Sequence, residues 1–75
     1  MKNNLLSGII DVSTRRKRRA ALSQAITLLE KIHSAEEAYL DHVPFNFRDS
    51  DAYEATEEIV DILGDAISTL LSVYD

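Results

Sequence analysis

Apolar residues recur every three or four positions over two long stretches of the chain. In the first stretch they are Leu22, Ala25/Ile26, Leu29, Ile32, Tyr39/Leu40 and Val43. This spacing places them on one side of an α-helix, and residues 14–42 contain no Gly or Pro. Ser13 or Thr14 is the expected N-cap. The pattern therefore predicts an amphipathic helix over residues 14–42.

A second apolar stripe runs through residues 51–74. Its members are Thr56, Ile59/Val60, Leu63, Ala66/Ile67, Leu70 and Val73/Tyr74. Ser50 or Asp51 is expected to cap this helix, because Asp51 and Glu54 have the spacing of a capping box. Gly64 lies inside the stripe, either as a tolerated helix glycine or at a close approach of a neighbouring helix.

The two predicted helices are separated by residues 43–50, which break the helical pattern. Pro44 keeps the residue before it out of the α region, so the first helix is expected to end near His42. Phe45 and Phe47 are expected to plug the open end of the core. Because the connection is short, the two helices should lie antiparallel.

The fold class predicted from these elements is all-α. An antiparallel two-helix hairpin over residues 13–75 would follow an N-terminal arm or short helix over residues 1–12. A hairpin of this size buries only one stripe per helix, so we expect a second copy to complete a four-helix bundle as a homodimer. The residues assigned to the core or the dimer contact are Leu22, Ile26, Leu29, Ile32, Leu40, Ile59, Val60, Leu63, Ile67 and Leu70.

Composition narrows the class of protein. There is no cysteine for a disulfide framework or a thiolate metal site, and the hydrophobic fraction of 45% is too high for a disordered chain. No apolar run is long enough to span a membrane, and the N-terminus lacks the apolar core of a signal peptide. We expect a soluble cytoplasmic protein with no cofactor and no membrane partner.

Charge is distributed unevenly along the chain. Residues 1–19 contain six cationic side chains and one acidic one, for a net charge of +5, whereas residues 20–75 contain two cationic and twelve acidic ones, for −10. Five of the cations, Arg15, Arg16, Lys17, Arg18 and Arg19, form a basic cluster at the start of the first helix, where the macrodipole disfavours them. Acids of the second helix end (Asp61, Asp65 and Asp75), an acidic partner or a phosphate would compensate them. A small nucleic-acid-associated regulator is therefore one alternative.

Four carboxylates raise the possibility of a metal site. Glu36 and Glu37 on the first helix are expected to face Glu58 and Asp61 on the second, and two such pairs can hold Mg²⁺ or Mn²⁺. They resemble the Glu-Glu-x-x-Glu and Glu-x-x-Asp motifs of MazG-like all-α nucleotide pyrophosphohydrolases. Position 40 is Leu where that family has its third Glu. The alternative function that this resemblance implies is a metal-dependent pyrophosphohydrolase.

The turn and the helix after it resemble another group of proteins. The stretch from Glu36 to Ser50, with the later segment Asp61-Ile62-Leu63-Gly64-Asp65-Ala66-Ile67, is similar to short, uncharacterised helical-hairpin proteins encoded by phages, prophages and other mobile elements. The chain departs from their pattern at His42, where Asn is commoner, and at Phe45, where Glu is commoner. The resemblance implies a hairpin of mobile-element origin, located in the host cytoplasm.

A further similarity concerns the helical domain of tRNA-modification GTPases, through residues 14–29 and 44–64. The motifs of a G domain are absent from the chain.

The main functional hypothesis is a non-catalytic interaction module of phage type. Its acidic helical surface would inhibit a host nucleic-acid-processing or defence protein by imitating the charge of nucleic acid. No residue is assigned a catalytic role. The predicted partner-binding residues are Glu36, Glu37, Phe45, Phe47, Asp49, Asp51, Glu54, Glu57 and Glu58.

Overall fold

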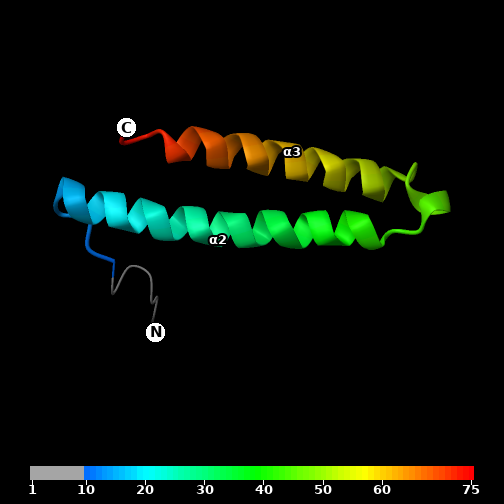
Figure 1. Ribbon diagram of the computed structural model, residues 1–75, viewed down its shortest axis with the longest axis horizontal. Helices are drawn as coiled ribbons and strands as arrows, with labels where there is room; N and C mark the ends of the chain where they lie inside the picture. The colour runs from blue at the N-terminus through cyan, green and yellow to red at the C-terminus, as the bar shows by residue number, and fades with distance from the viewer. Residues whose placement is uncertain (1–9) are drawn as a thin grey trace.

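Two antiparallel helices make up the described part of the chain. The computed structural model describes residues 10–75, so most of the predicted N-terminal arm lies outside the described residues. Helix α2, Arg15–His42, and helix α3, Asp51–Leu71, are joined through a short 3₁₀ helix, η1, Phe45–Phe47 (Figure 1). No strand occurs among residues 10–75. The prediction of an all-α antiparallel hairpin is confirmed.

Local hydrogen bonds define the helix ends that the sequence predicted. The Thr14 hydroxyl oxygen accepts from the backbone N–H of Lys17 at 3.1 Å and caps α2. The Ser50 hydroxyl oxygen accepts from the N–H of Tyr53 at 3.2 Å and caps α3. Helix α2 ends at His42, because Val43 takes the extended conformation (φ −73°, ψ 127°) that a following proline favours.

The end of α3 differs from the prediction. The helix was expected to continue to about residue 74, but it ends at Leu71. Beyond that point the backbone makes i→i+3 bonds, with Val73 N–H donating to Leu70 O at 3.2 Å and Asp75 N–H to Ser72 O at 3.3 Å. Such bonds satisfy the last carbonyl groups in a tighter turn than the α-helix has.

The phenylalanines of the turn do not close the core. Phe45 is 88% exposed and Phe47 57% exposed, so the prediction that they plug the end of the core is wrong. Both belong to η1, whose own backbone bonds, Phe47 N–H to Pro44 O (2.9 Å) and Arg48 N–H to Phe45 O (3.2 Å), close the turn and leave the rings outside it. Val43 and Tyr53, on either side of the turn, are half-buried there instead.

The two helices meet along one line of side chains, which we call the seam. Its members alternate at spacings of three and four, as in a coiled coil, and every one of them is buried or half-buried. From α2 and the residue after it, they are Leu22, Ile26, Leu29, His33, Glu36, Leu40 and Val43. From α3 and the segment after it, they are Tyr53, Thr56, Val60, Leu63, Ile67, Leu70 and Tyr74. Among the described residues only Ile26 and Ile67 are buried, at 7% and 8% exposure, and the other seam residues are half-buried.

Two residues assigned to the core lie outside the seam. Ile32 is 43% and Ile59 41% exposed, although both are more apolar than the seam residues beside them. The next seam positions after Leu29 lie four and three residues further on, at His33 and Glu36, so these side chains contact α3 and Ile32 does not. Burial here follows the rotation of the helix, about 100° per residue, rather than the hydrophobicity of each side chain.

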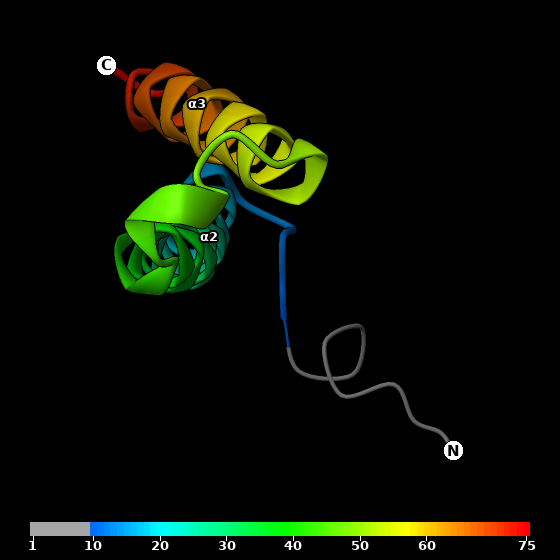
Figure 2. The same cartoon turned by 90° about the vertical axis from the view of Figure 1, so that its right-hand side faces the viewer.

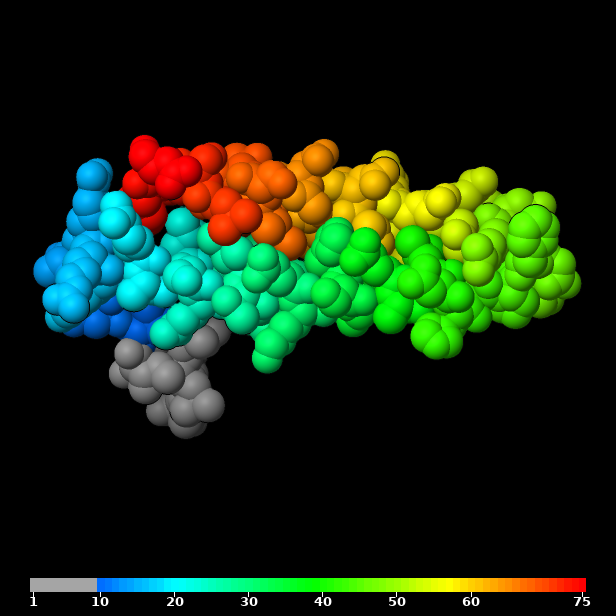
Figure 3. Space-filling model, viewed as in Figure 1, coloured from blue at the N-terminus to red at the C-terminus, as the bar shows by residue number. Residues whose placement is uncertain are grey.

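The hairpin is a single layer. Seen from the end, α2 and α3 lie side by side, and the described chain provides no further element over either broad face (Figure 2). The helices remain in contact from the turn to the open end (Figure 3). None of the described helices is apolar over a length sufficient to cross a membrane.

Candidate functional site

The seam divides the hairpin surface into two broad faces. In an antiparallel pair, the residue after each seam position lies on the same broad face in both helices. The second helix runs in the opposite direction and also contacts its neighbour with its opposite side, and these two reversals cancel. His33 verifies this arrangement. Its Nδ1 lies 3.5 Å from Oε1 of Glu37, which follows a seam residue of α2. Its Nε2 lies 3.4 Å from where a Cβ on Gly64 would stand, and Gly64 follows a seam residue of α3.

Seven of the fourteen positions that follow a seam residue carry acidic side chains, and we call the surface that these positions form the acidic face. All of these acids are exposed, and the part of this face on α2 and α3 beyond the basic cluster contains no Lys or Arg. The acids are Glu30, Glu37, Asp41, Glu54, Glu57, Asp61 and Asp75. Like charges along one face produce a negative field that attracts basic surfaces.

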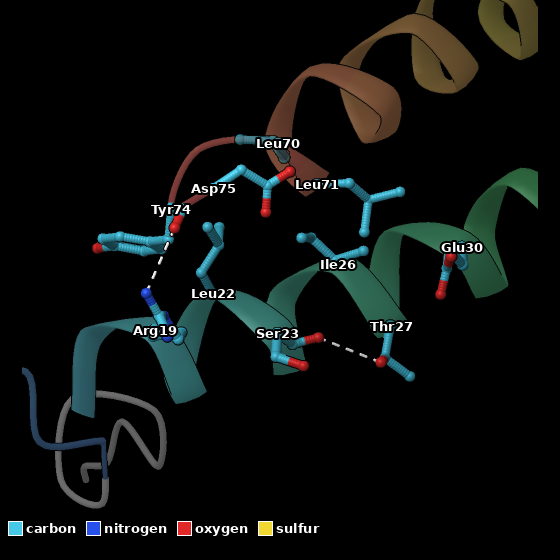
Figure 4. Close-up of a pocket in the computed structure, with 10 residues that line it drawn as sticks. All are labelled: Arg19, Leu22, Ser23, Ile26, Thr27, Glu30, Leu70, Leu71, Tyr74 and Asp75. Atoms are coloured by element: carbon cyan, nitrogen blue, oxygen red, sulfur yellow. Dashed lines mark hydrogen bonds between the residues drawn. The ribbon is translucent and has the colours of Figure 1, made fainter. Parts of the chain in front are cut away.

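A groove of about 390 Å³ lies between the helices at the open end of the acidic face (Figure 4). Its lining from α2 includes Ser23, Thr27 and Glu30, and its lining from the end of α3 includes Leu71 and Asp75. All five follow a seam residue, which supports the assignment of one face to both helices. The groove combines an apolar floor with carboxylates at its edge.

The basic cluster is engaged within the hairpin. The guanidinium groups of Arg15 and Arg19 lie 5.8 and 5.6 Å from the centre of the Tyr74 ring. Arg19 Nη2 also donates a hydrogen bond to Tyr74 O at 3.3 Å (Figure 4). Cations at the start of α2 thus lie beside the carbonyl end of α3, where the helix dipole favours positive charge. Arg18 Nη1 donates to Val12 O at 2.9 Å.

The salt bridge of the cluster involves an acid that precedes the helix. Lys17 Nζ lies 2.7 Å from Oδ2 of Asp11, and this contact, with hydrogen bonds from Ser13, lowers the pKa of the Asp11 carboxyl. No ion pair joins Asp61, Asp65 or Asp75 to the cluster among residues 10–75. The expected compensation by these acids is therefore wrong, because the tyrosine ring and main-chain carbonyls take their place.

The proposed metal ligands do not come together. Within residues 10–75, no group of three His, Cys, Asp or Glu side chains is arranged to hold a metal ion. Glu36 lies in the seam, Glu37 and Asp61 lie on the acidic face, and Glu58 lies on the outer side of α3. Helix rotation separates residues that the linear spacing seemed to pair.

The predicted partner-binding residues fall in four places. Glu37, Glu54 and Glu57 lie on the acidic face, and Glu36 is half-buried in the seam. Asp51 and Glu58 lie on the outer side of α3, two positions from the seam. At the turn, Phe45 and Asp49 line a surface hollow of about 360 Å³ together with Asn46 and Arg48, whereas Phe47 lies exposed outside that lining.

The sequence prediction missed several residues of these surfaces. Glu30 and Asp41 belong to the acidic face, and their position one residue after an apolar seam residue was the available signal. Tyr74 was expected only to pack in the core, yet it receives two guanidinium groups. No family model, curated protein or solved structure matches the chain.

Proposed function

We propose that the protein is a non-catalytic interaction module whose acidic face binds a basic surface on a partner protein. The observation that carries this proposal is the arrangement of seven exposed carboxylates on one face of both helices. Carboxylates that a helical pair already holds in place can bind a basic groove with little further loss of conformational entropy. Their main effect is to raise the association rate and to select basic partners.

The resemblance to phage-encoded hairpins supports a particular kind of partner. A basic groove that normally binds nucleic acid would accept the acidic face, because both present regularly spaced negative charge. The target we propose is a host nucleic-acid-processing or defence protein. The exposed rings of Phe45 and Phe47 would add apolar contacts at the end of the same surface.

The test compares two double substitutions on α3 that change the net charge equally. Glu57→Lys with Asp61→Lys alters the acidic face, and Glu58→Lys with Asp65→Lys alters the outer side of the same helix; all four side chains are exposed. Host proteins captured by immobilised chain are quantified at 50 and 300 mM NaCl, with and without duplex DNA as competitor.

The acidic-face variant should lose the captured target at least tenfold, whereas the outer-side variant should retain most of it. DNA and the higher salt concentration should both release the target, because contacts between exposed charges are screened. Equal capture by both variants, or capture that is indifferent to salt, would contradict the proposal.

A further inference from the structure

The face opposite the acidic one is free of Asp, Glu, Lys and Arg over the length of the hairpin beyond the basic cluster. We call it the apolar face, and its members are the residues that precede each seam position. On α2 they are Ala21, Ala25, Leu28, Ile32, Ala35, Tyr39 and His42; on α3 and its end they are Ala52, Ala55, Ile59, Ile62, Ala66, Thr69 and Val73. In a chain with 28% charged residues, the absence of these four charged types from fourteen surface positions requires an explanation.

The large side chains of this face are exposed to solvent in the single hairpin. Ile62 is 60% exposed, Leu28 58%, Val73 52% and Tyr39 49%, and Ile32 and Ile59 are the two predicted core residues found outside the seam. The other large exposed apolar residues of the described chain are Val12 before α2, Phe45 and Phe47 in the turn, and Leu71. Leu71 is therefore the one such residue from Arg15–His42 or Asp51–Leu71 that does not lie on the apolar face. A contiguous apolar surface of this kind marks a contact with another macromolecule.

The size of the face suits a protein interface. Helix α3 has 21 residues and is about 32 Å long, and two packed helices are about 20 Å wide. The face therefore measures about 600 Å² in projection. This is the same order as the roughly 800 Å² that each partner buries in an interface of standard size.

The small core indicates which molecule covers the face. With only Ile26 and Ile67 buried among the described residues, the hairpin depends on further burial for its own stability. The covering molecule must then be present whenever the chain is folded. A second copy of the chain meets this condition wherever the chain is concentrated enough to dimerise, whereas a foreign partner meets it only in the complex.

The shape of the face also suits self-association. His33 lies beside Gly64, and from this register we infer that Ile32 lies near Ala66 and Ala35 near Ile62. At these two places a large side chain on one helix adjoins a small one on the other. Surfaces that alternate in this way interdigitate when two copies meet about a two-fold axis.

We propose that the apolar face binds a second copy of the chain, forming a four-helix bundle in which the two acidic faces point outward on opposite sides. The dimer would cover Ile32 and Ile59 and would present two acidic faces to partners. This inference concerns the opposite surface from that of the proposed function, so either can fail without the other.

The first test compares two exposed apolar residues of α3 that receive the same substitution. Ile62→Glu, at 60% exposure, places a charge on the apolar face, and Leu71→Glu, at 57%, places one on the acidic side. Sedimentation equilibrium should give twice the chain mass for the unmodified protein and for L71E at 50 μM. I62E should weaken the dimer at least a hundredfold. A monomeric mass for the unmodified, helical chain would overturn the proposal.

A second measurement applies even if I62E fails to fold. The chain has no cysteine, so single cysteines at adjacent exposed positions can be labelled separately: Ala35→Cys on the apolar face and Ser34→Cys on the acidic face. At 50 μM a bulky maleimide should react at least tenfold more slowly with A35C than with S34C, and dilution should remove the difference. Equal rates at 50 μM, or a slower S34C, would assign the contact elsewhere and reject the proposal.

Discussion

A single aromatic residue joins the two ends of the described chain. The Tyr74 ring lies under the guanidinium groups of Arg15 and Arg19, and its carbonyl oxygen accepts a hydrogen bond from Arg19. The electron-rich face of the ring attracts cations, and the adjacent helix end carries partial negative charge. The basic cluster is thereby stabilised without a carboxylate from α3.

Replacing this ring should therefore cost more than the loss of a half-buried apolar side chain. We predict that Tyr74→Leu lowers the free energy of unfolding by about 1 kcal/mol, the usual scale for exposed cation–π contacts. Tyr53→Leu is the matched control, because Tyr53 is also half-buried in the seam and has no guanidinium over its ring among the described residues. Urea denaturation measures both. Equal losses would show that the cations contribute nothing.

Another residue-scale feature concerns the glycine inside α3. The sequence left open whether Gly64 is merely tolerated or marks the close approach of a helix. The neighbour is the His33 side chain, which would lie 3.4 Å from an added Cβ. The approach is that of an imidazole from the facing helix rather than of its backbone, and the register of the hairpin follows from it.

At the scale of elements, the start of α3 depends on one hydroxyl group. Two residues were candidates for the cap, and Ser50 accepts the N–H bond from Tyr53. Asp51 and Glu54 occupy the first turn instead, where carboxylates complement the helix dipole. The turn is thereby anchored on one side by Pro44 and on the other by Ser50.

We predict that Ser50→Ala lowers the free energy of unfolding by about 1 kcal/mol, because it leaves the N–H of Tyr53 without its acceptor. Ser34→Ala is the control, since Ser34 is exposed and its hydroxyl makes no hydrogen bond within residues 10–75. Urea midpoints at unchanged slope give the two values. An unchanged midpoint for S50A would mean that Asp51 can take over the cap.

At the scale of the whole molecule, most acidic side chains have no cationic side chain paired with them among the described residues. Residues 20–75 carry a net charge of −10 with His neutral, and the salt bridge between Lys or Arg and a carboxylate within the described chain is Lys17–Asp11. Acids on the acidic face and on the outer side of α3 repel one another in the folded hairpin more than in the unfolded chain. Solvent ions reduce this repulsion.

Raising NaCl from 20 to 500 mM should consequently raise the melting temperature by several degrees. A change of about 1 kcal/mol shifts the midpoint of a domain of this size by about 4–8 °C. The variant with Glu58→Lys and Asp65→Lys removes part of the repulsion, so its midpoint should depend less on salt. Differential scanning calorimetry measures both proteins, and a falling midpoint for the unmodified chain would refute the prediction.

Local features made most of the fold predictable. The helix periodicity, the proline and the serine and threonine caps depend on neighbours in the sequence, and the observed bounds Arg15–His42 and Asp51–Leu71 follow them closely. The three residues lost from the end of α3 and the exposed phenylalanines lie where hydrogen bonds of a turn replace the helical pattern. The candidate site was harder to predict from the sequence, because it depends on which side of each helix contacts the other helix.

By itself the sequence determined the two helices, their capping residues and their antiparallel connection, since each depends on backbone chemistry within a few residues. Only the tertiary structure decided the rotation of each helix about its axis. Contact between the helices leaves Glu36 and His33 half-buried and Ile32 exposed to water. A rotation of one residue, about 100°, decides which side chains face the partner helix. It therefore separates the acidic face from the apolar one.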